Sequence, residues 1–175
     1  MKQLLSLSVV IASCLLLSCQ KDVIQTDEES NNENLVLAAK ANNVKGRPFK
    51  GSYTTSSEIL QPPPNLHTRI TGTGHVTQLG SGTFVALSTL VFTAQPPFNL
   101  SGTATFTSAN GDEFYTRFTG TATPNNNGSL TIFNNHTITG GRGRFQNATG
   151  HFTGYTIAIP GHAEASIDYE GTISF

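Results

Sequence analysis

Hydrophobic and polar residues alternate along most of the chain after residue 45, and this period of two predicts β-strands. The even-numbered positions from Leu100 to Phe106 are apolar or glycine, whereas the odd-numbered positions between them are Ser or Thr. Residues 163–175 repeat the pattern, with Ile, Tyr and Phe on one face and Glu, Asp, Ser and Thr on the other. One apolar face and one polar face are typical of an antiparallel sheet with water on one side.

Turn-forming residues divide the chain from residue 46 onward into eight extended runs. Asn110-Gly111 is a strong signal for a tight hairpin, and the other connections are also short, which favours an up-and-down meander. Eight strands can close into a barrel and thereby remove the exposed sheet edges. We therefore expect an all-β fold, an eight-stranded antiparallel up-and-down barrel; a two-layer sandwich is the alternative. The expected strands are residues 47–59, 69–78, 83–93, 99–108, 113–123, 129–139, 151–159 and 163–175.

A recurring unit supports closure of the sheet. It consists of a large apolar residue, a spacer, Gly and Thr, as in Ile70–Thr73 and Phe118–Thr121. Glycine inside a strand usually marks a sharp bend or a close backbone approach. The third run, residues 83–93, departs from simple alternation because it is apolar on both faces, so we expect it to be buried on both, with residues 35–39 as a possible cover.

In a meander, alternate connections lie at the same end of the barrel. One end should collect the proline-rich connections, and the other should receive the N-terminal segment. The proline-rich end is therefore expected to point away from a membrane that holds the N-terminus. The connections expected at the proline-rich end are residues 61–67, 95–98, 124–128 and 159–162, and those at the other end are residues 79–81, 110–112 and 140–150.

Residues 1–19 have the features of a targeting segment, with Lys2 followed by an apolar run too short for a permanent membrane helix. Leu16-Leu17-Ser18-Cys19 resembles the bacterial lipobox, in which cleavage precedes a lipid-modified cysteine. Cys14 is a competing match, but apolar Leu15–Leu17 follows it, whereas polar residues follow Cys19; an ordinary secretory signal is the other alternative. The resemblance implies acylation of Cys19, with membrane lipid as a partner and the bacterial outer membrane as the location. Surface and periplasmic exposure both stay open.

Residues 20–45 contain no Gly, Pro or aromatic residue and are rich in Asn and acidic residues. Such a composition predicts a flexible polar tether. The expected domains are thus the signal peptide (1–19), the tether (20–45) and the barrel (46–175). Both cysteines lie before residue 20, so no disulfide is expected in the barrel.

Composition gives little support for catalysis. Six basic and six acidic residues follow residue 45, so no nucleic-acid surface is expected. His162 and Glu164 could share an ion, but two ligands without a third are weak evidence, and we expect no metal or cofactor. No nucleophile elbow is present, and the acids of residues 164–170 share one polar face instead of facing each other across a cleft.

The most distinctive stretch runs from Thr139 to Gly150. Its Gly-Gly-x-Gly-x-Phe and Ala-x-Gly elements resemble a segment shared by allene oxide cyclases, plant dirigent proteins and secreted bacterial proteins. The resemblance spans residues 68–175 and implies an allene-oxide-cyclase-like, calycin-type barrel, often oligomeric in that family. The glycines permit unusual backbone angles, and Phe145 can tuck into the end of the barrel. The structural turn motif comprises Gly140, Gly141, Gly143, Phe145 and Gly150.

The predicted function is binding or display by a non-catalytic barrel of a membrane-anchored lipoprotein. The candidate contact residues are His67, Phe98 and His162 at the proline-rich end, with a glycan or a small apolar molecule as ligand and a homo-oligomer possible. The alternative is a cyclase, isomerase or dirigent-like protein that uses an apolar barrel cavity. Against it, the inward face is expected to carry aromatic, aliphatic and glycine residues with no polar set, and Arg69, Tyr115 and Arg117 to face outward.

Overall fold

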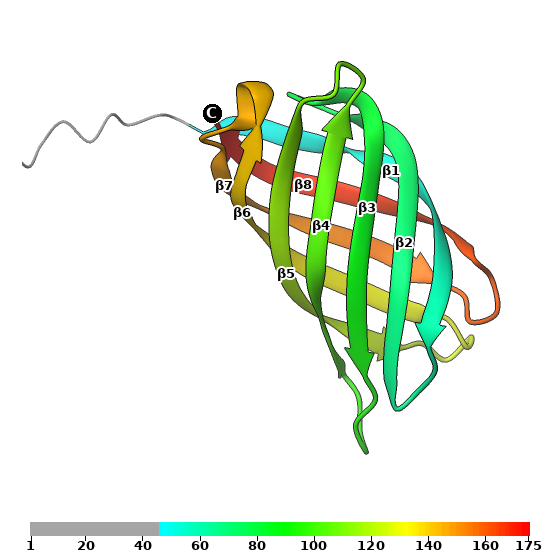
Figure 1. Ribbon diagram of the computed structural model, residues 1–175. Coiled ribbons are helices and arrows are strands. Elements are labelled where there is room, and N and C mark those ends of the chain that lie inside the picture. The colour runs from blue at the N-terminus through cyan, green and yellow to red at the C-terminus, as the bar shows by residue number, and fades with distance from the viewer. Residues whose placement is uncertain (1–45) are drawn as a thin grey trace, which may run out of the picture. The chain divides into compact units, whose positions relative to one another are not determined.

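Eight antiparallel strands close into an up-and-down barrel in the computed structural model, which describes residues 46–175 (Figure 1). The predicted fold class is confirmed, and the sandwich alternative is wrong. A single short 3-10 helix, η1 (Gly143–Phe145), interrupts the meander between β6 and β7. The strands are β1 (Arg47–Gln61), β2 (Asn65–Val76), β3 (Gly80–Val91), β4 (Phe98–Ser108), β5 (Glu113–Pro124), β6 (Leu130–Arg142), β7 (Thr149–Ala158) and β8 (Glu164–Ser174).

The barrel closes through β1 and β8, which pair from Arg47 opposite Ile173 to Ser56 opposite Glu164. Each strand therefore has two hydrogen-bonded neighbours. Gly46 and Phe175 consequently lie at one end, here called the proximal end (Figure 1). The connections 62–64, 92–97, 125–129 and 159–163 lie at the opposite, distal end, as the alternation of strand directions predicted.

Most strand boundaries differ from the sequence prediction by one or two residues, and the start of β2, the start of β3 and the end of β6 differ by three or four. β2 begins at Asn65 instead of residue 69, because the ladder with β3 continues to Asn65 opposite Val91, and the proline turn needs only residues 62–64. β6 continues to Arg142 because the β5–β6 register shifts between Tyr115 and Thr116, which absorbs an extra residue. Gly140 has a φ of +135° at this point, an angle that side-chain-bearing residues rarely adopt.

β3 is not buried on both faces, contrary to the prediction. Its outward side chains Val85, Leu87 and Val91 are exposed. Residues 35–39, the suggested cover, lie outside the described residues, as do the predicted signal peptide, the tether and Cys19. Among residues 46–175, no helix is long and apolar enough to cross a membrane.

The repeated glycines make room for large side chains from the neighbouring strand. Gly102 lies directly opposite Phe118 on β5, and a Cβ at Gly102 would come within 2.5 Å of the Phe118 ring. Gly154 lies opposite Tyr169 on β8, whose Cε1 would be 2.8 Å from an added Cβ. Gly72 and Gly171 also lie opposite rings, those of Phe84 and Phe152, whereas Gly120 lies opposite Asn134. Space for a ring on the neighbouring strand thus accounts for most of the repeated glycines.

Aromatic rings fill the proximal part of the lumen. Phe49, near the start of β1, contacts four other rings at centroid distances of 4.5 to 6.5 Å. Phe106 stacks on Phe114 at 4.7 Å, and Phe145 of η1 packs edge-on against Phe114 at 5.5 Å. Phe145 is fully buried and closes this end of the barrel. The proximal lumen is therefore a packed core and not a pore.

Candidate functional site

β6 places two polar side chains inside the barrel, Asn134 and His136, and both are buried. The His136 ring lies parallel to the Phe152 ring at 4.7 Å and tilted against Phe118 at 4.8 Å. Its Nδ1 is 3.1 Å from the Thr116 Oγ1. Burial lowers the pKa of His136 to about 3, so the imidazole is neutral near pH 7.

Three polar atoms in this interior have no hydrogen-bond partner among the described residues. They are the Tyr53 hydroxyl, the Asn134 Oδ1 and the His136 Nε2. Burial raises the pKa of Tyr53, and burial together with the neighbouring Tyr53 raises that of Tyr169. In residues 46–175, the buried polar side chains are therefore neutral hydrogen-bonding groups, and none of them is Asp, Glu, Lys or Arg.

The expectation of an inward face without polar residues was wrong for β6. Ile132 faces the core, and a period of two from Ile132 also turns Asn134 and His136 inward. The alternation itself could have identified them. The alternation is hard to see, because four consecutive polar residues (134–137) stand between Phe133 and Ile138. Arg69, Tyr115 and Arg117 do face outward, as predicted.

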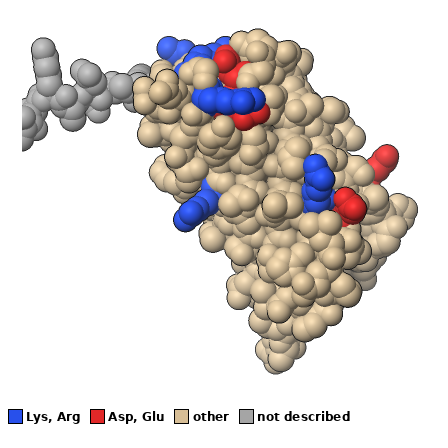
Figure 2. All heavy atoms as spheres, in the orientation of Figure 1, with Lys and Arg blue, Asp and Glu red and all other residues tan. Residues whose placement is uncertain are grey.

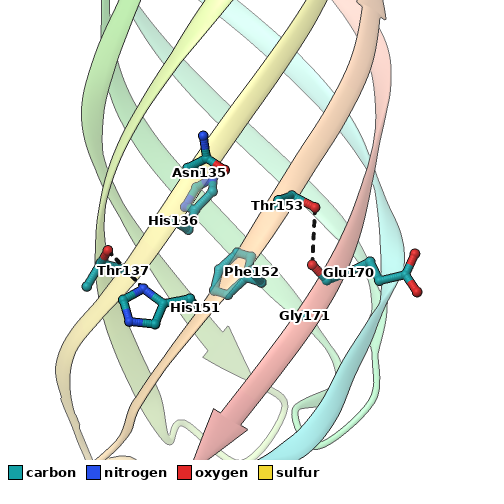
Figure 3. A pocket seen from close by; sticks show the side chains of 8 residues that line it. All are labelled: Asn135, His136, Thr137, His151, Phe152, Thr153, Glu170 and Gly171. Atoms are coloured by element: carbon teal, nitrogen blue, oxygen red, sulfur yellow. Dashed lines mark hydrogen bonds between the residues drawn. The ribbon is translucent and has the colours of Figure 1, made fainter.

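The outer wall is hollowed over β6, β7 and β8 (Figure 3), with a volume of about 280 Å³. Thr137 and His151 are joined across this hollow by a 3.2 Å hydrogen bond to the His151 Nδ1. Thr153 donates its hydroxyl to the backbone oxygen of Glu170 at 3.2 Å. The Glu170 carboxylate extends toward β1, where it lies 3.6 Å from the Lys50 Nζ. The side chains that line this β6–β8 hollow from outside are Asn135, Thr137, His151, Thr153 and Glu170.

A second hollow of about 450 Å³ lies over β1, β2 and β3. Its outward lining consists of small hydroxyl side chains with Val85 and Glu164. Charge is sparse on the face of the barrel shown in Figure 2. The lining of each hollow includes one acidic residue and no Lys or Arg, Glu170 in the first and Glu164 in the second.

The three contact residues predicted from the sequence lie at the distal end but in different settings. His67 is half-buried on β2, with its Nδ1 3.2 Å from the Thr89 Oγ1. Phe98 packs against the core and lies 4.8 Å from the Phe92 ring. His162 is exposed in the β7–β8 connection. Within residues 46–175 no hydrogen bond or ring contact joins any two of His67, Phe98 and His162.

Sequence reasoning missed three exposed aliphatic side chains at the same end, which are called the distal aliphatic cluster below. Ile59 is 65% exposed, Leu60 54% and Ile159 53%. β1 extends beyond its last pair with β8, so Ile59 and Leu60 lie in a stretch bordered by β2. The Ser57 amide donates to the Ala163 oxygen at 2.9 Å, which brings the connection that holds Ile159 next to this part of β1.

The glycine-rich motif has a structural setting at the proximal end. A Cβ at Gly141 would clash with backbone oxygens of Glu113 and Phe145. Gly143 has a φ of +64° and starts η1. Next to it, Arg144 pairs with Asp112 at 3.5 Å. Gly140 and Gly150 also have positive φ angles, +135° and +142°. Among the described residues no three His, Cys, Asp or Glu side chains are grouped to hold a metal ion.

Comparison with known proteins found no family model, no curated protein and no solved structure that matches this chain. The resemblance to allene oxide cyclases and dirigent proteins therefore stays a prediction. The closed barrel is compatible with that resemblance but does not by itself identify a family.

Proposed function

We propose that this chain is a lipid-anchored protein of the bacterial envelope whose barrel binds a protein partner at its distal end. The supporting observation is the aliphatic cluster of Ile59, Leu60 and Ile159, each more than half exposed. Large apolar side chains gathered on a surface are typical of contact sites. The cluster lies at the end opposite Gly46, the first described residue.

The packed lumen supports a binding role over catalysis. Phe49, Phe106 and Phe152 occupy the space that a substrate would need. The buried titratable groups have pKa values displaced away from neutral pH: that of His136 is lowered, and those of Tyr53 and Tyr169 are raised. General acid–base catalysis is most effective with a pKa near the working pH, which these residues lack.

The anchor can be tested by cysteine substitution in the full-length chain. Acylation at Cys19 predicts that Cys19→Ser moves the protein from the membrane fraction to the soluble fraction. Cys14→Ser is the matched control and should leave the protein in the membrane fraction. If only Cys14→Ser released the protein, the lipid would be attached to Cys14 and not to Cys19. If both variants stayed in the membrane fraction, the proposal of an acyl anchor would be refuted.

The distal contact can be tested with a photo-crosslinking amino acid in living cells. A crosslinker in place of Leu60 should give an adduct of defined mass, and Ile159→Ser in the same chain should reduce its yield about tenfold. A crosslinker in place of exposed Asn147, between η1 and β7 at the proximal end, is the control. Equal adducts from both positions, or no effect of Ile159→Ser, would refute the distal contact.

His67→Ala and His162→Ala test the contact residues predicted from the sequence in the same assay. If they contribute, the adduct at Leu60 should weaken. Phe98 is a poor probe of binding, because its ring packs against the core and its removal would also destabilise the barrel.

The alternative, a cyclase or isomerase that binds a small molecule in the lumen, is favoured by one observation. The Tyr53 hydroxyl, Asn134 Oδ1 and His136 Nε2 are buried without protein partners, and such groups usually bond to water or a ligand. Native mass spectrometry of the chain extracted from its own cells tests this alternative. A bound small molecule that His136→Phe removes would support it, and a bare mass for both proteins would exclude it.

A further inference from the structure

We propose that the β6–β8 hollow binds one residue of a neutral carbohydrate chain. The site lies on the side of the barrel and is independent of the distal aliphatic cluster. Its volume of about 280 Å³ corresponds to roughly nine water molecules at ~30 Å³ each. That volume suits a single sugar ring, with the rest of the chain running along the wall.

The polar lining can bind hydroxyl groups, which both donate and accept hydrogen bonds. The Asn135 amide offers donors and an acceptor and has no protein partner within residues 46–175. Thr137 holds the His151 Nδ1, which fixes the ring and leaves its Nε2 for a ligand. Glu170 accepts the Thr153 hydroxyl through its backbone oxygen, whereas its carboxylate extends away from the other lining residues toward Lys50 on β1 (Figure 3).

Two exposed aromatic rings continue the hollow toward the distal end. Phe133 and Tyr155 lie directly opposite each other on β6 and β7. They are 42% and 45% exposed, and they follow Asn135 and Thr153 at the next outward position on each strand. An exposed ring face packs well against the C–H groups of a sugar ring, and its edge stays in water. Exposed aromatic rings next to planar hydrogen-bonding groups, here the Asn135 amide and the His151 imidazole, are the combination of side chains that binds a neutral saccharide.

The charges around the hollow argue against an ionic ligand. Arg117 lies opposite Thr137, and Lys50 opposite Glu170. Asp168 lies opposite Tyr155. Two basic and two acidic side chains therefore surround the site, and their charges cancel. An anionic or cationic ligand would meet as much repulsion as attraction.

Binding can be measured by calorimetry on the full-length chain in a zwitterionic detergent, which carries no sugar. The probes are maltohexaose, cellohexaose, xylohexaose, mannohexaose and laminarihexaose, with polygalacturonate as an anionic comparison. We expect at least one neutral probe to bind with a Kd below about 1 mM, a free energy of about −4 kcal/mol. Tyr155→Ala should weaken that binding about tenfold, and Asn135→Ala should also weaken it.

Tyr115→Ala is the matched control, because Tyr115 is an outward tyrosine that is 36% exposed and lies outside the hollow. It should leave binding unchanged, and Tyr155→Phe should preserve most of it because the ring is kept. No binding of any neutral probe, binding of polygalacturonate alone, or equal losses from Tyr115→Ala and Tyr155→Ala would overturn the proposal. Leu60→Ser with Ile159→Ser should keep sugar binding, so failure of the distal contact and failure of this site are distinguishable.

Discussion

His136 is the residue whose surroundings change its chemistry most. Phe118 and Phe152 cover its ring, Tyr169 packs edge-on at 5.5 Å and Thr116 holds its Nδ1. Burial lowers the pKa of His136 to about 3, because the charged form would lose its hydration. The unfolded chain binds a proton at this side chain near pH 6.5, so acid favours unfolding.

Stability should therefore depend on pH through this residue. Its contribution is complete above pH ~6.5 and falls as the pH drops toward 3, by at most ~1.4 kcal/mol per pH unit. His136→Phe keeps a ring in the stack but removes the titration. The free energy of unfolding is measured by urea denaturation from pH 8 to pH 4. The value for the wild-type chain minus the value for His136→Phe should fall toward acid. A difference that stays constant over this range would contradict the neutral, buried state of His136.

Gly154 tests the pairing of glycines with rings. An alanine Cβ would meet only side-chain atoms, the Tyr169 ring at 2.8 and 3.2 Å and an Ile167 methyl at 3.6 Å. Because the Tyr169 ring is fixed by its neighbours, Gly154→Ala should destabilise the barrel by ~1–3 kcal/mol. Tyr169→Leu should cost less in the Gly154→Ala background than in the wild-type chain, a coupling of ~0.5–3 kcal/mol. If the losses of unfolding free energy from Gly154→Ala and Tyr169→Leu were additive in chemical denaturation, the absence of a side chain at Gly154 would not be needed to accommodate the Tyr169 ring.

At the scale of elements, η1 acts as the proximal closure of the barrel. Phe145 is fully buried, and its ring lies 5.5 Å from Phe114 and 4.8 Å from Phe175. The Arg144 guanidinium carbon lies over the Phe145 ring, 4.7 Å from its centroid. The turn motif thus places one ring into the core just before β7 begins.

Phe145→Ala should consequently lower the free energy of unfolding by ~3–5 kcal/mol. Phe133→Ala removes the same side chain from the outer wall, where the ring is 42% exposed, and should change stability by only ~0.5 kcal/mol. Thermal and denaturant unfolding of both variants measures the contrast. Similar losses at the two positions would mean that Phe145 is not a core residue.

The sequence predicted elements better than it predicted their ends or the site. Period two and the Asn110-Gly111 turn were sufficient for eight strands in meander order. The longer β2 and β6 were missed because ladder pairing with β3 and β5 overrides the turn signals at residues 65–68 and Gly140. The β6–β8 hollow was not predictable, since it joins side chains of three strands, and their register depends on the whole closed barrel.

At the scale of the molecule, closure is the property on which the surface sites depend. The β1–β8 ladder, from Arg47 opposite Ile173 to Ser56 opposite Glu164, leaves no strand in residues 46–175 with an open edge along its central part. Opening one ladder of a barrel exposes two strands at once, so local opening is costly and β1 should be as protected as the others. Amide hydrogen exchange, followed by mass spectrometry on the full-length chain, should give residues 48–55 and 165–172 the same slow exchange as 100–107 in β4. Fast exchange confined to β1 and β8 would instead indicate a sheet with two edges, and the lateral hollow over β6–β8 would then lose its β1 border at Lys50.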